Sequence, residues 1–217
     1  LLIRGCITAA GLSLLPGHVL AQLARLAQDE TPIDWSDDLT GPVNSDFPVL
    51  QWDNLDAWIT PSDQIFKAGH YPEPEIDMST YNLEITGAVK NSLTFTLDDI
   101  KAMPSKDIEF TLECSGNRGV RGFRGGVYNA KWTGTPLVDI LKKAGMLESG
   151  IEVVFFGHDE GEEVITPRRS KEITMKQNFA RSLTIDQSMD PDILIAYHVN
   201  GEPLAPGYGF PLRLIVP

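Results

Sequence analysis

Cysteine and histidine are scarce in this sequence, which contains two cysteines and four histidines in 217 residues. So few thiols exclude a disulfide-rich scaffold, which needs several cysteine pairs. The sequence has no Cys-x-x-Cys-His segment and no flavin fingerprint, so it offers no attachment site for a haem of its own. Its histidines and carboxylates show no metal-ligand spacing. A single thiol, Cys114, is therefore the strongest candidate for a metal ligand.

Positive charge is also in deficit, because 18 Lys and Arg residues stand against 30 Asp and Glu residues and leave a formal net charge of −12. A nucleic-acid partner is excluded on this ground, since a phosphate backbone requires a basic face. The exception is local, where Arg118, Arg121 and Arg124 recur among glycines. Their guanidinium groups and the backbone amides suit an anionic group. A solvated arginine loop is the alternative.

Long hydrophobic runs are missing as well. The most apolar segment, residues 1–21, is interrupted by Gly, Pro and His, and is too short and broken to favour a membrane-spanning helix. An arginine ahead of apolar residues and a closing Val-Leu-Ala are typical of an export signal, here truncated at its start, and predict a periplasmic protein. Cys6 would leave with this signal. The alternative is a buried first helix of the mature domain.

The rest of the chain combines short strands with few helices. Residues 22–64 show no sustained period and predict an irregular N-terminal arm that packs on the domain through its tryptophans. Residues 65–217 predict one domain of the α+β class, truncated at its C-terminus because the chain stops inside a strand. Thr135 is expected to cap a helix that starts at Pro136 and ends at Gly145. The other expected features are strands at 81–86, 93–96, 107–112, 151–156 (buried), 193–199 and 212–216, a helix at 98–103, a turn at Asn200-Gly201, a surface turn at His158, and arm contacts through Trp35, Trp52 and Trp58.

The segment around Cys114 carries most of the chemical information. Residues 108–112 alternate apolar and polar side chains as in a half-buried strand, and the Ser-Gly-Asn run at 115–117 cannot continue it, so Cys114 lies at the strand end. Nearby cations would hold its sulfur as the thiolate, the form that binds metals. The alternative is a free cysteine buried at the end of a strand.

Four segments match a known family in order and spacing: residues 114–118 (CSGNR), 130–137 (AKWTGTPL), 194–204 (LIAYHVNGEPL) and 209–217 (GFPLRLIVP). Over roughly residues 59–217 the chain resembles the sulfite oxidase family of molybdopterin-dependent oxidoreductases, and bacterial sulfite dehydrogenases in particular. The resemblance implies a mixed-sheet α+β domain of the sulfite oxidase type, with molybdenum and molybdopterin as cofactors.

The resemblance also implies roles for individual residues. Cys114 would ligate molybdenum beside the dithiolene sulfurs of the pterin and so take part in catalysis. Tyr197 would be catalytic, with its hydroxyl at the substrate. His198 points to the opposite face of the same strand and is expected to be structural. The implied contacts to the pterin or its phosphate are His70, Ser115, Asn117, Arg118 and Arg181.

One position departs from the family pattern. Ala68 stands where sulfite-oxidising members have an arginine that binds the anionic substrate, so the identity of the substrate stays open. Lys67, Arg121 or Arg124 would have to supply the charge, and a lysine lacks the planar fork of an arginine.

The resemblance therefore implies an exported molybdenum-molybdopterin oxidoreductase that oxidises a small sulfur oxyanion such as sulfite. It would fold with its cofactor before export and pass electrons to a separate cytochrome. The alternatives are a sulfoxide reductase of the same fold, a non-catalytic binding module that kept the fold, and a cysteine hydrolase. Family members often add a C-terminal dimerisation domain, so the full-length protein is a candidate homodimer.

Overall fold

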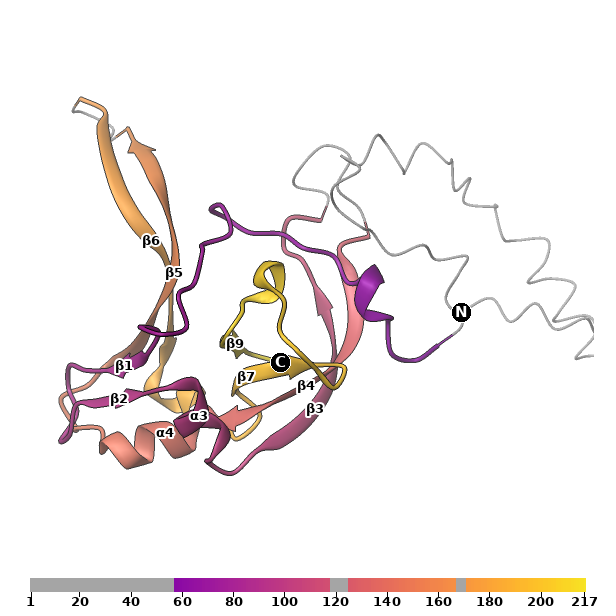
Figure 1. Cartoon of the computed structure of the whole chain (residues 1–217). Coiled ribbons are helices and arrows are strands. Elements are labelled where there is room, and N and C mark those ends of the chain that lie inside the picture. Colours follow the sequence, from indigo (N-terminus) through magenta and orange to yellow (C-terminus); the bar gives the residue numbers. More distant parts are fainter. Residues whose placement is uncertain (1–56, 118–124, 167–170) are drawn as a thin grey trace, which may run out of the picture. The chain divides into compact units, whose positions relative to one another are not determined.

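The computed structural model describes residues 57–117, 125–166 and 171–217 (Figure 1). All of them belong to the second of the two units into which the chain divides, residues 40–217. Among these residues, no helix has the length and apolar character needed to cross a membrane. Predictions that fall outside the described residues are the export signal, most of the N-terminal arm, Cys6, Trp35, Trp52, Arg118, Arg121 and Arg124.

A five-stranded sheet forms the centre of the described unit. Its strands follow the order β3 (Lys106–Glu113), β4 (Val127–Pro136), β7 (Leu194–Val199) and β8 (Glu202–Pro203), and β9 (Arg213–Ile215) also pairs with β7. Every one of these ladders is antiparallel. The α+β class is confirmed, and in this part of the chain the expected mixed sheet is built from antiparallel pairs.

Two further strands, β1 (Leu83–Ile85) and β2 (Leu93–Phe95), form a separate antiparallel pair. Both lie inside the ranges predicted from the sequence. The predicted turn after β7 is confirmed too, because Asn200 has φ 52° and Gly201 has φ 86°. Left-handed backbone at both positions is typical of the tight Asn-Gly turn that reverses a strand.

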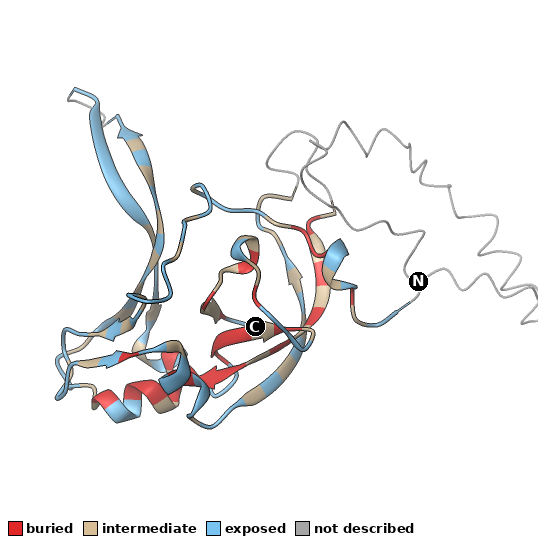
Figure 2. Cartoon of the chain, in the orientation of Figure 1, coloured by how far each residue is buried: buried red, intermediate tan, exposed pale blue. Residues whose placement is uncertain are grey.

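The sheet separates two hydrophobic clusters, because successive side chains of a strand point to opposite faces. Figure 2 shows β4 and β7 as the most deeply buried strands, as expected for the layer between the two clusters. The first cluster, which we call the cysteine face, contains Ile65, Phe66, Tyr128, Ala130, Trp132, Leu194, Ala196, Val199, Leu204, Tyr208 and Ile215, with Cys114 packed at its margin. The second cluster, the helix face, contains Phe95, Ile100, Leu137, Ile140, Leu141, Ile193, Ile195 and Tyr197.

Two short helices, α3 (Leu97–Lys101) and α4 (Leu137–Ala144), supply the helix face with buried aliphatic side chains. The helix predicted at 98–103 is confirmed as α3, with bounds shifted toward the N-terminus, and Thr96 and Asp99 form a capping box at its start. The end of α4 at Gly145 is also confirmed, since this glycine has φ 71° and closes the helix. The remaining short elements are α5 (Ile185–Ser188) and the 3-10 turns η3 (Ser62–Gln64) and η4 (Pro206–Tyr208).

The start of α4 differs from the prediction that Thr135 caps it. Pro136 occupies the cap position, and no side chain bonds to the helix there. Thr135 instead continues β4, where it pairs with Ile195, and its Oγ1 donates a hydrogen bond to the Ile100 carbonyl at 2.9 Å. The threonine is fully buried, so sheet pairing and this bond decide its place rather than the helix end.

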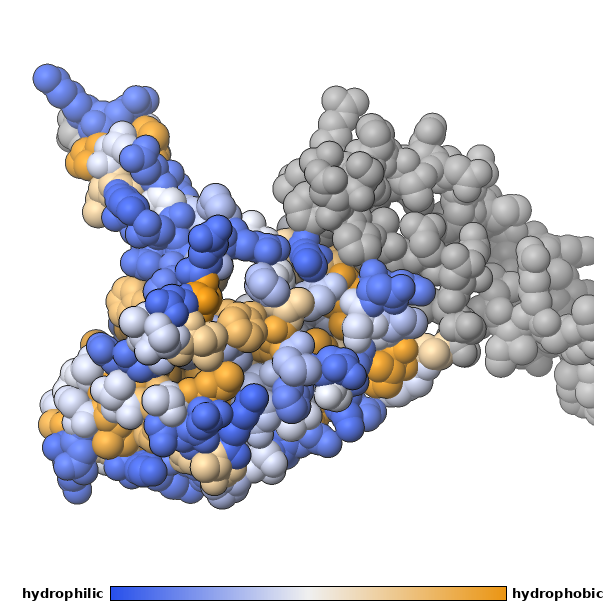
Figure 3. All heavy atoms as spheres, viewed as in Figure 1, coloured by the Kyte–Doolittle hydropathy of each residue, from blue (hydrophilic) through white to orange (hydrophobic). Residues whose placement is uncertain are grey.

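The longest strands, β5 (Glu152–Ile165) and β6 (Ile173–Thr184), form an antiparallel hairpin. Its ladder is interrupted between Phe156 and Glu160 by an irregularity that contains His158. His158 is exposed, as predicted, but it lies within a strand rather than in a turn. The hairpin is mainly hydrophilic in the view of Figure 3, with hydrophobic side chains near its tip.

The prediction of a buried strand at 151–156 is wrong about its burial. The side chain of Ile151 is 83% exposed and that of Phe156 is 75% exposed. The side chains of β5 alternate between exposed and partly buried along most of the strand, so one face of the ladder remains uncovered. Only the base of the hairpin packs against the helix face, through Val153, Phe155 and Leu183.

Trp58 does not anchor the end of the N-terminal arm as predicted, because its side chain is 77% exposed. Hydrogen bonds hold this segment instead. The Thr60 amide donates to the Asn129 carbonyl at 2.8 Å, and the Asn129 amide donates to Thr60 Oγ1 at 3.1 Å. The buried side chains of Ile65 and Phe66 then attach the segment to the cysteine face.

Replacing Thr135 with valine removes the hydroxyl group and keeps the shape of the side chain. We expect the free energy of unfolding to fall by about 1 kcal/mol, because a buried hydrogen bond is lost. Urea denaturation measures this difference. Thr94→Val is the matched control, since Thr94 is exposed on β2, and it should change stability by less than about 0.5 kcal/mol. Equal stability of the two variants would contradict the role of Thr135.

Candidate functional site

Cys114 lies directly after the last residue of β3, at the margin of the cysteine face. Its amide donates to the Gly126 carbonyl at 2.8 Å, and the chain then turns, with the Asn117 amide donating to the Cys114 carbonyl at 3.0 Å. Its sulfur accepts a hydrogen bond from the Gly116 amide at 3.3 Å. The side chain is half-buried and forms no disulfide. Such a sulfur remains partly accessible to a ligand.

Asn117 closes the loop that follows. Its Nδ2 donates to the Gly126 carbonyl at 2.9 Å, and its Oδ1 accepts from the Gly126 amide at 3.0 Å. The side chain thus joins the two ends of the segment 118–124. Ser115, between Cys114 and this closure, is exposed. Asn117 thus holds the loop beside Cys114, and its contact with the cofactor stays a prediction.

His70 precedes the β5–β6 hairpin in the sequence and packs against both of its strands. Its Nε2 is 2.8 Å from Glu163 Oε1, and its ring contacts the rings of Tyr71 and Phe179 at centroid distances of 4.5 and 5.7 Å. The hydrogen bonds from His70 and from Tyr71 lower the pKa of Glu163. Arg181 places its guanidinium 4.3 Å from the centre of the Phe179 ring. His70 and Arg181 thus both contact the ring of Phe179.

Tyr197 lies apart from Cys114. Its ring is packed in the helix face, with Lys101 Nζ 5.8 Å from its centre, whereas Cys114 packs against the cysteine face. The register shift between Thr133 and Gly134 leaves Tyr197 without a partner in the β4 ladder. A Cβ on Gly134 would overlap the backbone of β7, so the two strands approach very closely at this point. The position of Tyr197 gives no support to a catalytic partnership with Cys114.

Sequence reasoning missed two residues of the cysteine face. Trp132 is fully buried, and its Nε1 has no hydrogen-bond partner among the described residues. Arg213 Cζ lies 5.2 Å from the centre of that ring, and the guanidinium charge also partly offsets the rise that burial causes in the pKa of Tyr128. One signal could have identified Arg213, because it alternates with the apolar residues of β9 and shares the inward face of Ile215.

A second cation lies near this pair. Lys67 Nζ is 5.1 Å from the centre of the Tyr208 ring, and the Arg213 side chain donates to the Tyr208 carbonyl at 3.4 Å. Neither Lys67 nor Arg213 takes part in an ion pair with a described carboxylate. In a chain of strong negative charge, two unpaired cations beside an unpaired buried N–H group favour an anionic ligand.

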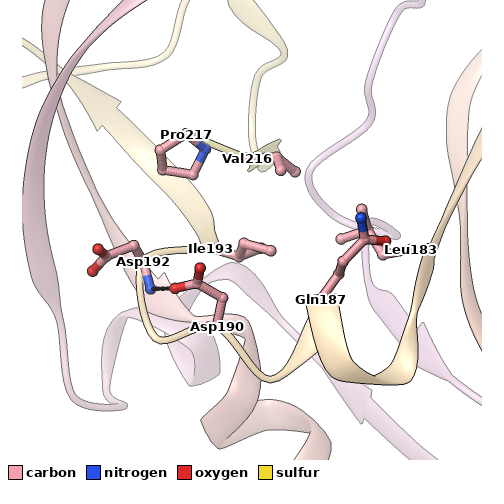
Figure 4. Close-up of a pocket in the computed structure, with 7 residues that line it drawn as sticks. All are labelled: Leu183, Gln187, Asp190, Asp192, Ile193, Val216 and Pro217. Carbon is pink, nitrogen blue, oxygen red and sulfur yellow. Dashed lines mark hydrogen bonds between the residues drawn. The ribbon is translucent and has the colours of Figure 1, made fainter.

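Two cavities of about 430 Å³ each open elsewhere. Figure 4 shows the first, where Gln187 and Asp190 lie below Val216 and Pro217 and the Asp192 amide donates to Asp190. The second is lined by Pro72, Glu73, Pro74, Glu75, His158, Glu160 and Asn178. Neither includes Cys114, whose adjoining segment 118–124 is outside the described residues. The described part of the chain also contains no group of three His, Cys, Asp or Glu side chains that could hold a metal.

Comparison with known proteins identifies the family. Residues 70–217 match the family model described as the oxidoreductase molybdopterin binding domain. The chain belongs to this family. The resemblance to sulfite oxidases seen in the sequence is thereby confirmed, as is the molybdenum-molybdopterin cofactor that membership of the family implies.

Several relatives of this molybdopterin-binding domain are known. Mitochondrial sulfite oxidase of Macaca fascicularis is 35% identical over 176 residues, which are 74% of this chain and 30% of that protein. Nitrate reductase [NADH] 2 of Phaseolus vulgaris is 32% identical over 195 residues, 82% of this chain and 21% of that protein. The chain thus spans less than a third of the length of these relatives.

A solved structure supports the same fold. The sulfane dehydrogenase SoxCD of Paracoccus pantotrophus superimposes with a TM-score of 0.62 at 28% sequence identity, over 76% of this chain and 40% of that chain. The described residues also fit the cofactor of the family. The soft sulfur of Cys114 suits a molybdenum that brings further sulfur ligands with its pterin. Trp132 Nε1, which has no hydrogen-bond partner among the described residues, and the guanidinium of Arg213 suit an anionic group.

Asn117→Ala tests how the loop beside Cys114 is held. We expect the free energy of unfolding to fall by about 2 kcal/mol, because two hydrogen bonds to Gly126 are lost at about 1 kcal/mol each. The control is Asn178→Ala, since Asn178 is exposed and makes one long contact of 3.5 Å to Asp159. It should cost less than about 0.5 kcal/mol. Denaturation curves that coincide for the two variants would argue against the closure by Asn117.

Proposed function

We propose that the protein is a molybdenum-molybdopterin oxidoreductase that oxidises a small sulfur oxyanion such as sulfite. The observation that carries the proposal is the position of Cys114, a half-buried thiol at a strand end that accepts an N–H hydrogen bond from Gly116 at 3.3 Å. A thiol with this access and this donor is suited to metal ligation rather than to core packing.

Each part of the site has a proposed task. Cys114 Sγ ligates the metal, and the Gly116 amide stabilises the thiolate charge. Arg213 and Trp132 Nε1 bind an anionic part of the cofactor or substrate, because Trp132 Nε1 has no hydrogen-bond partner and Arg213 forms no ion pair among the described residues. Arg181 contacts the pterin from the hairpin, and His70 contacts it from the segment packed against the hairpin. Ser115, Asn117 and Arg118 hold or contact it from the loop. When bound, the cofactor supplies oxygen-atom transfer and accepts two electrons.

A sulfur substrate and a cytochrome partner are supported by the similar proteins. They include sulfite oxidases and a sulfane dehydrogenase, and the sequence contains no haem-attachment motif of its own. We also propose that residues 1–21 direct export to the periplasm, that 22–64 form an arm on the catalytic domain 65–217, and that the full-length protein is a homodimer.

Ala68 favours a second candidate, a sulfoxide reductase of the same fold. The alanine is exposed and uncharged where an anionic substrate calls for a cation, whereas a sulfoxide is neutral. Turnover with sulfite and with a small sulfoxide, each measured on the metal-loaded protein, separates the two. If neither substrate is turned over, the result favours the third hypothesis, a non-catalytic binding module that kept the fold.

Cys114→Ser tests the metal ligand. We expect X-ray absorption at the molybdenum edge to show one fewer bound sulfur atom than in the wild-type protein, because serine offers oxygen. Activity should fall by about 100-fold, the range seen when groups that tune a metal centre are removed.

Thr94→Val is the control, since Thr94 is exposed on β2 and has no role in the proposed site. It should keep both the sulfur count and the activity. An unchanged number of sulfur ligands in the Cys114 variant would contradict the proposal.

A further inference from the structure

The pair formed by His70 and Glu163 joins segments that are 93 residues apart in the sequence. His70 precedes the strands of the sheet, and Glu163 lies near the outer end of β5. The side chains are 52% and 36% exposed, so solvent screens their attraction, and such a pair adds little to stability. The main effect of the pair is therefore geometric, because it orients the imidazole of His70.

A carboxylate accepts hydrogen bonds and does not donate them. With Glu163 ionised, the hydrogen on the 2.8 Å contact must come from His70 Nε2. A neutral histidine has one protonated nitrogen, so Nδ1 is then the acceptor. The rings of Tyr71 and Phe179 contact the imidazole at 4.5 and 5.7 Å and limit its rotation.

Glu163 is itself held in place by a short chain of hydrogen bonds. The Tyr71 hydroxyl donates to Glu163 Oε1 at 3.1 Å, and Gln177 Nε2 donates to that hydroxyl at 3.2 Å. The ring of Tyr71 lies so close to Gly161 that a Cβ there would overlap it. The hairpin thus presents the carboxylate to His70 from a fixed position.

We propose that Glu163 is a positioning residue, which fixes His70 as the Nε2–H tautomer and leaves Nδ1 to accept a hydrogen bond from an N–H or NH2 group of the pterin. This inference rests on the proposed function, in which His70 contacts the cofactor. A pterin ring carries such donors. An acceptor held in one tautomer binds them without the free-energy cost of moving the ring proton first.

The hairpin acquires a role from this arrangement that its exposure alone does not suggest. Tyr71, Gln177 and Gly161 form a support behind Glu163, and Glu163 in turn supports His70. The histidine predicted to contact the pterin is therefore oriented by the part of β5 beyond Phe155, which contributes to neither hydrophobic cluster.

Glu163→Gln tests the proposal on the cofactor-loaded protein. Glutamine has the same shape and can still bond to His70, but it both donates and accepts, so it does not select a tautomer. We expect nitrogen NMR shifts of the His70 ring to report protonated Nε2 in the wild type and a tautomer mixture in the variant. Pterin retained after dialysis, measured by fluorescence of its oxidised form, should fall about tenfold.

Glu162→Gln is the matched control. Glu162 is the adjacent residue, pairs across the ladder with Lys176, and is exposed on the other face of β5. It should keep the wild-type tautomer and pterin content. A purely structural latch between His70 and the hairpin would survive in Glu163→Gln, so wild-type ring shifts and pterin retention in that variant overturn the proposal.

His70→Ala separates this inference from the proposed function. If His70→Ala loses pterin while Glu163→Gln keeps it, the positioning role of Glu163 fails and the cofactor contact stands. If His70→Ala keeps the wild-type pterin content, the cofactor contact of His70 fails as well. Loss in both variants, with Glu162→Gln unchanged, is the expected result.

Discussion

The close pairing of β4 with β7 is the constraint on which the rest of the structure depends. Gly134 allows the two backbones to approach so closely that any side chain there would overlap β7. Because these strands are the most buried of the sheet, they divide the interior into the cysteine face and the helix face. A residue on β7 belongs to one face or the other by its position alone, and this decides which residues can meet Cys114.

Backbone turns hold Cys114, and other strands contribute polar side chains to the same face of the sheet. Gly116, Asn117 and Gly126 fix the thiol and its loop through hydrogen bonds to the main chain. Arg213 and Trp132, from β9 and β4, add positive charge and an unpaired N–H group on the same face. A metal that brings most of its ligands with its cofactor needs only one thiolate from the protein, together with donors for the anionic groups of that cofactor.

Much of the fold could be predicted from the sequence, because its local signals agree with the tertiary structure. Alternation of side chains located β3, Gly145 marked the end of α4, and Asn200-Gly201 marked the turn after β7. The failures are tertiary in origin. Thr135 looks like a cap until its pairing with Ile195 is known. The apolar residues at 151–156 look buried, although only Val153 and Phe155 pack against the helix face. For the site, sequence located the thiol, but the face occupied by Tyr197 and the contact of Arg213 with Trp132 depend on the register of the sheet.

The anchoring of the hairpin midway along its length has a consequence for how this domain tolerates change. Its base packs on the helix face, and Tyr71 and His70 contact it at Gly161 and Glu163, whereas the described strand residues beyond Glu163 pair only with each other. Insertions or deletions in that outer stretch leave both cores and the thiol loop untouched. Insertions near the outer end of β5 and β6 should therefore lower the free energy of unfolding only slightly.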